Sequence, residues 1–257
     1  MKKHYFRRGL LLSLCAAILL LIAACGAPQE EVKTYKLACL GDSITFGVGS
    51  SDPDCKYTSV IRDEADFIES VQSVATGSAM VGLSPTATAW HTYSLVNRYS
   101  AIDEDTDFIF IFGGTNDFGY TSGDTSGVPL GEPGDTTADT FYGALEILIN
   151  NLRTDYPNAI LLFATPLQRD DTANDFSPAD SPYNVFGYTL EDYREAIIYV
   201  CEKEDVEYID LYNLEGMRLS DPEFSERYAD GLHPNDAGYK IVAEAIIAKL
   251  KTMLPQD

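Results

Sequence analysis

Short apolar runs alternate along this chain with segments of helical periodicity. The clearest runs are continuously apolar, which favours strands buried on both faces over strands with one solvent-exposed face. The runs lie at residues 35–40, 67–74, 107–112, 159–164 and 206–209. Helices are expected between them, at 58–66, 89–100, 138–153, 189–201 and 235–254. This alternation predicts an α/β fold, in which helices cover both faces of a central parallel sheet of about five strands.

The helical pattern is strongest between residues 138 and 153. Six apolar residues recur there at i, i+3, i+4, i+7, i+8 and i+11, which places them on one stripe of a helix. Thr189 followed by Asp192 predicts a capping box at the start of a later helix. Nothing between residues 35 and 254 has the composition of a linker, so we expect a single domain.

The first 24 residues are a different kind of sequence. Four basic residues precede the apolar stretch 10–22, and Ala23 and Ala24 follow it. This pattern predicts an export signal and is too short for a good membrane span. Ile22-Ala23-Ala24-Cys25 resembles the bacterial lipobox, whose cysteine becomes the lipidated N-terminus after cleavage. We therefore expect Cys25 to anchor the protein on the outer side of the bacterial cell membrane, with ordinary secretion after cleavage near Ala24 as the alternative.

On this interpretation, residues 25–34 are a polar tether and 35–257 are the folded domain. The chain carries 40 Asp and Glu against 18 Lys and Arg, a net charge of −22. Such a surface repels nucleic acid, so no nucleic-acid partner is expected. The charge fits a neutral or cationic substrate, although solubility alone also explains it.

The cysteines do not predict a disulfide scaffold. Cys15 lies in the export signal, which leaves Cys39, Cys55 and Cys201 in the domain, an odd number. Cys39 and Cys201 fall on apolar faces typical of buried free thiols, while one bridge involving Cys55 stays open. No cysteine pair has metal-site spacing, so neither a metal nor an organic cofactor is expected.

Three polar motifs lie just after predicted strands or before the last helix. They are Gly41-Asp42-Ser43-Ile44-Thr45, Gly113-Gly114-Thr115-Asn116-Asp117 and Asp230-Gly231-Leu232-His233-Pro234-Asn235. Right-handed crossovers put the carboxyl ends of parallel strands at one edge of the sheet. The motifs can therefore converge there, although they are far apart in the sequence.

The motifs hold the residue types of an acyl-transfer site. A serine hydroxyl such as that of Ser43 needs a nearby base, and His233 is the best candidate because His4 lies in the export signal. His91, next to Trp90, fits a surface or hydrogen-bonded polar residue better. Asp230 can accept a hydrogen bond from the imidazole and fix its tautomer.

An oxyanion hole can be built from the side-chain amide of Asn116 and the backbone N–H groups of Ser43 and Gly77. The structural alternatives are a capping or turn role for His233 and ordinary turn roles for Asn116 and Gly77.

Together the three motifs resemble the signature blocks of the SGNH (GDSL-type) hydrolases, in the family's order and over roughly residues 35–254. The resemblance implies a flavodoxin-like three-layer α/β/α fold. It also implies Ser43 as nucleophile, His233 as base, Asp230 as its orienter, and an oxyanion hole from Ser43, Gly77 and Asn116. The chain departs from the family at Gln72 and Thr76-Gly77, where an asparagine and Ser-Gly are usual, and at Ile44, where leucine is usual.

We expect an exported serine esterase that works through an acyl-enzyme. Surface placement, negative charge and three loop tyrosines, Tyr120, Tyr183 and Tyr188, favour deacetylation of a neutral glycan. A lysophospholipase or lipase-type acyl hydrolase is the enzymatic alternative. A non-catalytic glycan-binding lipoprotein is the alternative from another class. The glycine-rich loop 118–136 is either a flap that contacts substrate or an inert surface loop.

Overall fold

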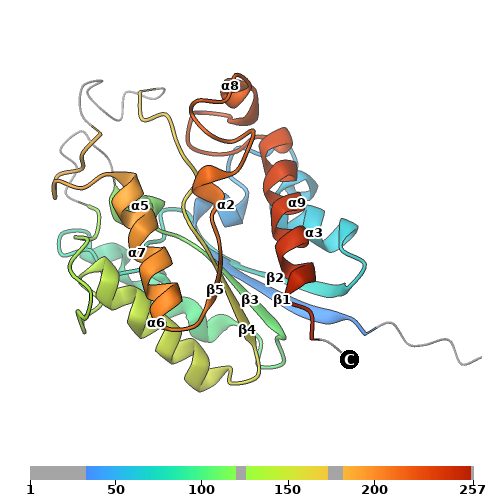
Figure 1. Cartoon of the computed structure of the whole chain (residues 1–257), viewed down its shortest axis with the longest axis horizontal. Helices are drawn as coiled ribbons and strands as arrows, with labels where there is room; N and C mark the ends of the chain where they lie inside the picture. The colour runs from blue at the N-terminus through green and yellow to red at the C-terminus, as the bar shows by residue number, and fades with distance from the viewer. Residues whose placement is uncertain (1–32, 120–125, 173–181, 256–257) are drawn as a thin grey trace, which may run out of the picture. The chain divides into compact units, whose positions relative to one another are not determined.

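Five parallel strands form the central sheet of the domain (Figure 1). The computed structural model describes residues 33–119, 126–172 and 182–255. The strands are β1 (Tyr35–Gly41), β2 (Ile68–Ala75), β3 (Phe108–Phe112), β4 (Ile160–Ala164) and β5 (Glu207–Ile209). Every neighbouring pair is parallel, and the order across the sheet is β2-β1-β3-β4-β5, as in flavodoxin-like folds. The predicted α/β fold and its five-stranded parallel sheet are therefore confirmed.

Helices cover both faces of this sheet and make a three-layer structure (Figure 1). One face carries α6 (Phe141–Asp155), α7 (Leu190–Lys203) and the single turn α4 (Leu95–Arg98), and the other carries α3 (Tyr57–Glu64) and α9 (Asp236–Thr252). The shorter elements are α2 (Ser43–Phe46), α5 (Thr115–Phe118), α8 (Phe224–Arg227) and the 3₁₀ turns η1 (Pro53–Cys55), η2 (Thr88–Tyr93), η3 (Tyr99–Ala101) and η4 (Leu211–Asn213).

The central strand β3 shows why the apolar runs are continuous. All five of its residues are buried. Ile109 and Ile111 belong to the core beneath α6 and α7, whereas Phe108, Phe110 and Phe112 belong to the core beneath α3 and α9. A strand with a hydrophobic core on each side has no face left for polar residues, as its sequence predicted.

The continuous helix predicted at 89–100 is wrong. The structure has η2, then the single turn α4, then η3 over this region. Ser94 takes an extended conformation between η2 and α4, with φ −62° and ψ 146°. The backbone N–H groups of Leu95 and Val96 donate to the carbonyls of Met80 and Val81 at 2.8 and 3.3 Å. These tertiary bonds replace the intrahelical bonds of the expected helix, so tertiary contact overrides the local pattern.

The loop at 118–136 is in part firmly packed. Residues 120–125 lie outside the described ranges, but Val128 and Leu130 are buried. The backbone N–H of Val128 donates to the carbonyl of Asp117 at 2.8 Å. The second half of the loop is therefore part of the core that supports α5. The three described cysteines are free, and Cys39 and Cys201 are buried as expected.

Several sequence predictions fall on residues that the structure does not describe. They concern the export signal 1–24, the lipidation site Cys25, nearly all of the tether 25–34, and Tyr120. In the described ranges, no helix combines the length and the apolar character needed to cross a membrane.

The predicted capping box at the start of α7 is confirmed, and it yields a stability prediction. The Thr189 hydroxyl accepts from the Asp192 N–H at 3.3 Å, and the Asp192 carboxylate accepts from the Thr189 N–H at 2.6 Å. Thr189→Ala leaves the Asp192 N–H without its cap and should lower the free energy of unfolding by about 1 kcal/mol. Urea denaturation measures this change. Thr189→Ser keeps the hydroxyl and is the control, so equal losses in both variants would contradict the capping role.

Candidate active site

Ser43 lies where β1 turns directly into the short helix α2. Asp42 caps this helix, because its Oδ1 accepts from the Ile44 N–H at 2.9 Å. A side chain at Gly41 would collide with the Thr45 hydroxyl and approach the Phe112 carbonyl oxygen to 2.8 Å. Only glycine therefore allows the strand to end this tightly against β3. The turn leaves Ser43 largely buried, with 8% of its surface exposed.

The structure brings Ser43, His233 and Asp230 together in one chain of hydrogen bonds. His233 Nε2 lies 3.0 Å from Ser43 Oγ, and His233 Nδ1 lies 2.7 Å from Asp230 Oδ2. A carboxylate can only accept, so Nδ1 carries the hydrogen and Nε2 is left to accept the Ser43 hydroxyl proton. The three residues that sequence analysis selected thus have the geometry of a nucleophile, a base and an orienting acid.

Asp230 also fixes the loop that carries His233. Its Oδ1 accepts from the backbone N–H groups of Leu232 at 3.0 Å and His233 at 2.7 Å. Partial burial raises the pKa of Asp230. Hydrogen bonds from the His233 backbone, the His233 ring and the Leu232 backbone lower it by more than burial raises it, so the net pKa lies below its ordinary value. The Asp230 carboxylate is therefore negatively charged at neutral pH, where it can stabilise a positively charged imidazole.

The nucleophile turn and the histidine loop are also joined by the last helix. Asn235 caps α9 by accepting from the N–H groups of Ala237 and Gly238 at 3.0 and 3.2 Å. On the first turns of α9, the Tyr239 hydroxyl donates to the carbonyls of Ile44 at 3.0 Å and Val48 at 2.6 Å. The hydrogen bonds from Tyr239 to these two backbone carbonyls thus help to set the separation between Ser43 and His233, in addition to the hydrogen bond between those two residues.

Asn116 and Gly77 lie at the same edge of the sheet. Asn116 is on α5, directly after β3, and its Nδ2 donates to the Ala79 carbonyl at 2.9 Å and lies 3.5 Å from Asp42 Oδ2. Gly77 follows β2 by two residues, and a Cβ there would meet no atom within 4 Å. Contacts within the described chain therefore do not require glycine at 77. The catalytic roles of both residues remain predictions.

Two buried carboxylates support these turns. Asp117 accepts from the N–H groups of Val81 and Gly82 at 2.8 and 2.9 Å, and burial raises its pKa to about 6. Burial likewise raises the pKa of Asp42 to about 7, although the bond from the Ile44 N–H opposes the shift. Sequence analysis had assigned neither residue a role.

Arg169 was also missed by sequence analysis. This buried guanidinium donates to the Thr115 carbonyl at 3.1 Å and to its hydroxyl at 2.9 Å, and also to the Gly119 carbonyl. It pairs with Asp171 at 2.7 Å and lies over the Phe118 ring at 4.7 Å. Arg169 therefore holds both ends of α5, the helix that carries Asn116.

A small hollow of about 120 Å³ lies beside Asn116. Its lining residues are Ser78, Met80, Trp90, Asn116, Gly119 and Ser126. Trp90, the only tryptophan of the chain, was not selected from the sequence although it stands next to His91. His91 donates from Nε2 to the Ser84 carbonyl at 2.6 Å, so it is a hydrogen-bonded polar residue as expected.

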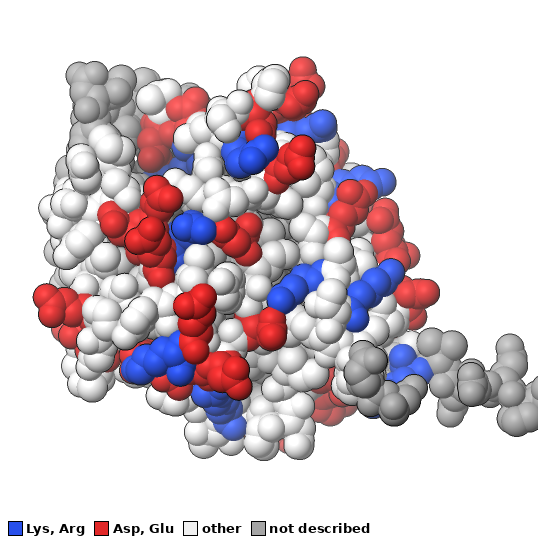
Figure 2. Space-filling model, in the orientation of Figure 1, with Lys and Arg blue, Asp and Glu red and all other residues white. Residues whose placement is uncertain are grey.

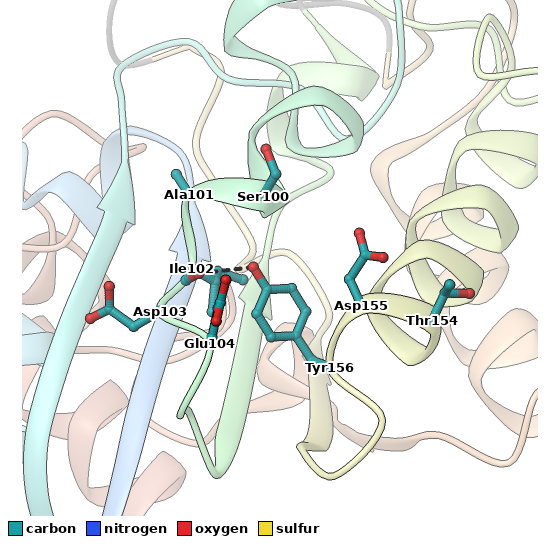
Figure 3. Close-up of a pocket in the computed structure, with 8 residues that line it drawn as sticks. All are labelled: Ser100, Ala101, Ile102, Asp103, Glu104, Thr154, Asp155 and Tyr156. Carbon is teal, nitrogen blue, oxygen red and sulfur yellow. Dashed lines mark hydrogen bonds between the residues drawn. The ribbon is translucent and has the colours of Figure 1, made fainter.

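A larger hollow of about 830 Å³ opens at the opposite edge of the sheet (Figure 3). It is lined by residues 100–104, which precede β3, and by residues 154–156 at the C-terminal end of α6. In it, the Tyr156 hydroxyl donates to the Ile102 carbonyl at 2.9 Å, and Asp103, Glu104 and Asp155 are among the lining residues. None of the predicted site residues lines it. Among the described residues, no group of three or more His, Cys, Asp or Glu is arranged to hold a metal ion.

Comparison with known proteins gives the family. The model of the GDSL-like lipase/acylhydrolase family matches residues 39–241. The chain belongs to this family. A GDSL esterase/lipase of rice (Oryza sativa subsp. japonica), WDL1, is 29% identical over 116 residues, which are 42% of this chain and 44% of the rice protein. The match thus spans less than half of that relative.

Solved structures share the fold of this chain. A protein from Lactobacillus plantarum is 31% identical, with a TM-score of 0.72 over 88% of this chain and 100% of its own. The inhibitor-bound aryl esterase of M. smegmatis is 17% identical, with a TM-score of 0.63 over 86% of this chain and 100% of its own, and it shares the fold. The chain thus has both the sequence of the GDSL-like lipase/acylhydrolase family and a fold found in solved structures.

The buried Asp42 gives this protein a testable pH dependence of stability. Its folded pKa of about 7 lies above the ordinary value of 3.8. Between these values the native state keeps a proton that the unfolded state has released, so the Asp42 contribution to stability is lost as the pH rises through this window. Asp42→Asn keeps the cap without the charge. The free energy of unfolding of the wild type relative to Asp42→Asn should therefore fall between about pH 4 and pH 7.

Urea denaturation of both proteins across this range provides the measurement. Ser73→Ala, at an exposed position that carries no titratable group, is the control, and its free energy of unfolding relative to the wild type should not vary with pH. A constant difference between the wild type and Asp42→Asn would show that Asp42 is ionised in the folded protein throughout.

Proposed function

We propose that this GDSL-family hydrolase is a serine esterase that cleaves carboxylic esters through an acyl-enzyme. The observation that carries the proposal is the unbroken chain of hydrogen bonds from Asp230 through His233 to Ser43. Such a chain turns an otherwise weak hydroxyl into a nucleophile.

The reaction follows from this geometry. As Ser43 Oγ bonds to the ester carbonyl carbon, its proton passes to His233 Nε2 and the carbonyl oxygen becomes an oxyanion. The bond to the leaving oxygen then breaks, and Nε2 returns the proton to that oxygen, releasing the alcohol. Water repeats the sequence on the acyl-enzyme, with Ser43 Oγ leaving and recovering its proton. Asp230 stabilises the imidazolium in both stages.

The oxyanion would lie against Asn116 and the backbone N–H groups of Ser43 and Gly77. An amide donor of this kind contributes roughly 10²–10³ in rate. Asn116 is suited to the task because Ala79 and Arg169 fix its side chain and its helix before substrate arrives. A donor that is already held in place costs no reorganisation during the reaction.

Our preferred substrate is an acetylated neutral glycan. The net charge of −22 disfavours anionic substrates, and Figure 2 shows acidic side chains spread over the face in view, with Lys and Arg among them. Of the three tyrosines expected to contact sugar, Tyr183 is 52% exposed and Tyr188 packs against the core. Release of fatty acid from lysophospholipid without acetate release from acetylated sugars would favour the lysophospholipase alternative instead.

We further propose that the protein is exported and held at the outer side of the bacterial membrane. The basic and apolar pattern of residues 1–24 and the lipobox-like sequence ending at Cys25 support this placement. Residues 25–34 would separate the lipid from the domain at 35–257. Labelling with a radioactive fatty acid, lost in Cys25→Ser, tests the anchor, and an unlabelled secreted wild-type protein would contradict it.

The nucleophile is tested by removing one hydroxyl. Ser43→Ala should lower kcat for p-nitrophenyl acetate by about 10⁴-fold or more, because His233 then has no group to activate. Ser73→Ala, at an exposed serine of β2, is the control and should retain full activity. A serine-reactive phosphonate should label the wild type once, at Ser43. An unlabelled and inactive wild type would favour the glycan-binding alternative.

The base is tested by the pH profile of kcat/KM. Activity should fall on the acid side as His233 becomes protonated, since an imidazolium cannot accept the Ser43 proton. Asp230 does not account for this fall, because its pKa lies below the ordinary value. Asp42, with a pKa of about 7, changes charge in the same range, so the profile is repeated in Asp42→Asn, where the acid fall should persist. Initial rates with p-nitrophenyl acetate, in buffers of constant ionic strength, provide the profile. A rate that stays flat well into acid would count against His233 as the base.

A further inference from the structure

We propose that the hollow beside Asn116 is the acyl-binding pocket and that Trp90 is the wall that restricts it to short acyl groups. This inference rests on the serine-esterase function proposed above and goes beyond it by assigning the site its acid specificity. The hollow measures about 120 Å³ and borders Asn116 on one side and Trp90 on another.

The position of the hollow identifies which half of the ester it would take. The tetrahedral carbon bonds to Ser43 Oγ, to the oxyanion, to the leaving oxygen and to the acyl group. The leaving oxygen must face His233, which returns a proton to it, and the oxyanion must face Asn116. The hollow is lined by Asn116 but by neither Ser43, His233 nor Asp230. The hollow therefore borders the oxyanion donor on a side that the triad does not line, and we place the acyl group there because the leaving oxygen must face His233.

The size of the hollow limits the acyl chain. The hollow is small, at about 120 Å³. Acetyl and butyryl groups therefore match its size better than a fatty acyl chain does. Pockets that enclose larger ligands usually begin near 300 Å³.

One wall of the pocket is held too firmly to widen. Asp117 accepts from the N–H groups of Val81 and Gly82, and Asn116 donates to the Ala79 carbonyl. The Met80 carbonyl accepts from the Leu95 N–H at 2.8 Å. Segment 79–82 is thus fixed at four successive residues, so this side cannot move back to admit a longer chain without breaking buried hydrogen bonds.

The Trp90 wall is built differently. It stands on η2, none of whose residues is buried, and Trp90 itself is 45% exposed. Its ring packs against Tyr93 with centroids 5.7 Å apart, and the neighbouring His91 ties the turn to the Ser84 carbonyl. A half-exposed tryptophan contributes little to the core, and this one borders the hollow. Removing its side chain should enlarge the pocket without unfolding the protein.

Chain-length selectivity tests the inference. The wild type should hydrolyse p-nitrophenyl acetate and butyrate with higher kcat/KM than the octanoate. Trp90→Ala should raise the ratio of octanoate to acetate kcat/KM by about tenfold or more, since each methylene newly buried is worth about fourfold. Tyr199→Ala removes an equally exposed aromatic side chain from α7, which does not line the hollow, and should leave the ratio unchanged. Trp90→Phe should give a smaller rise and serves if the alanine variant does not fold.

Three results would overturn the inference. The first is an unchanged ratio in Trp90→Ala with acetate hydrolysis retained. The second is a wild type that prefers octanoate. The third is a Trp90→Ala variant in which selectivity among the acetates of different alcohols shifts while acyl-chain selectivity does not, because the hollow would then hold the alcohol. Failure of the esterase function itself is distinguishable, because the wild type would then hydrolyse no ester and Ser43 would not react with the phosphonate.

Discussion

The active-site edge depends on the register of the parallel strands. Gly41 at the end of β1 pairs with Ala75 of β2 and Phe112 of β3, Phe112 pairs with Ala164 of β4, and Ala164 pairs with Ile209 of β5. The last residues of all five strands therefore form one row across the sheet. Every loop that leaves this row starts at the same level. This is why residues separated by 190 positions, Ser43 and His233, can meet within 3.0 Å.

This edge concentrates groups that cost stability. Burial raises the pKa of both Asp42 and Asp117 and so disfavours their charged forms. Backbone N–H groups offset part of this cost, from Ile44 to one carboxylate and from Val81 and Gly82 to the other. The turns that carry Ser43 and Asn116 are thus held by hydrogen bonds from backbone N–H groups to buried carboxylates, whereas apolar cores pack against both faces of the sheet. Burying Asp42 and Asp117 lowers the stability of the folded protein, but their hydrogen bonds fix the turns that carry Ser43 and Asn116.

The sequence was informative where structure is local. Strand β3 was predictable because a strand buried on both faces must be continuously apolar. The start of α7 was predictable because a capping box spans only four consecutive residues. The helix at 89–100 was wrong because its N–H groups bond to Met80 and Val81, which no local pattern encodes. Arg169 was missed for the same reason, since its contacts to Thr115 and Gly119 cross at least 50 residues. The three sequence motifs were exceptions to this rule. Their contacts are long-range, but their resemblance to the signature blocks of a known family predicted that they would lie together.

The candidate active site and the hollow beside Asn116 share helix α5, but the hollow is also lined by Trp90 from η2. Asn116 and Asp117 are neighbours on α5, and together they hold segment 79–82 through the Ala79 carbonyl and the Val81 and Gly82 N–H groups. A change in this segment would therefore disturb Asn116, the proposed oxyanion donor, as well as the hollow. Trp90 lines the same hollow from η2, which bonds to neither Asn116 nor Asp117 through any hydrogen bond found among the described residues. If the hollow takes the acyl group as we propose, substitution of Trp90 should alter which acid is accepted and leave the proposed chemistry at Ser43 intact, so that acyl selectivity and catalysis are separable.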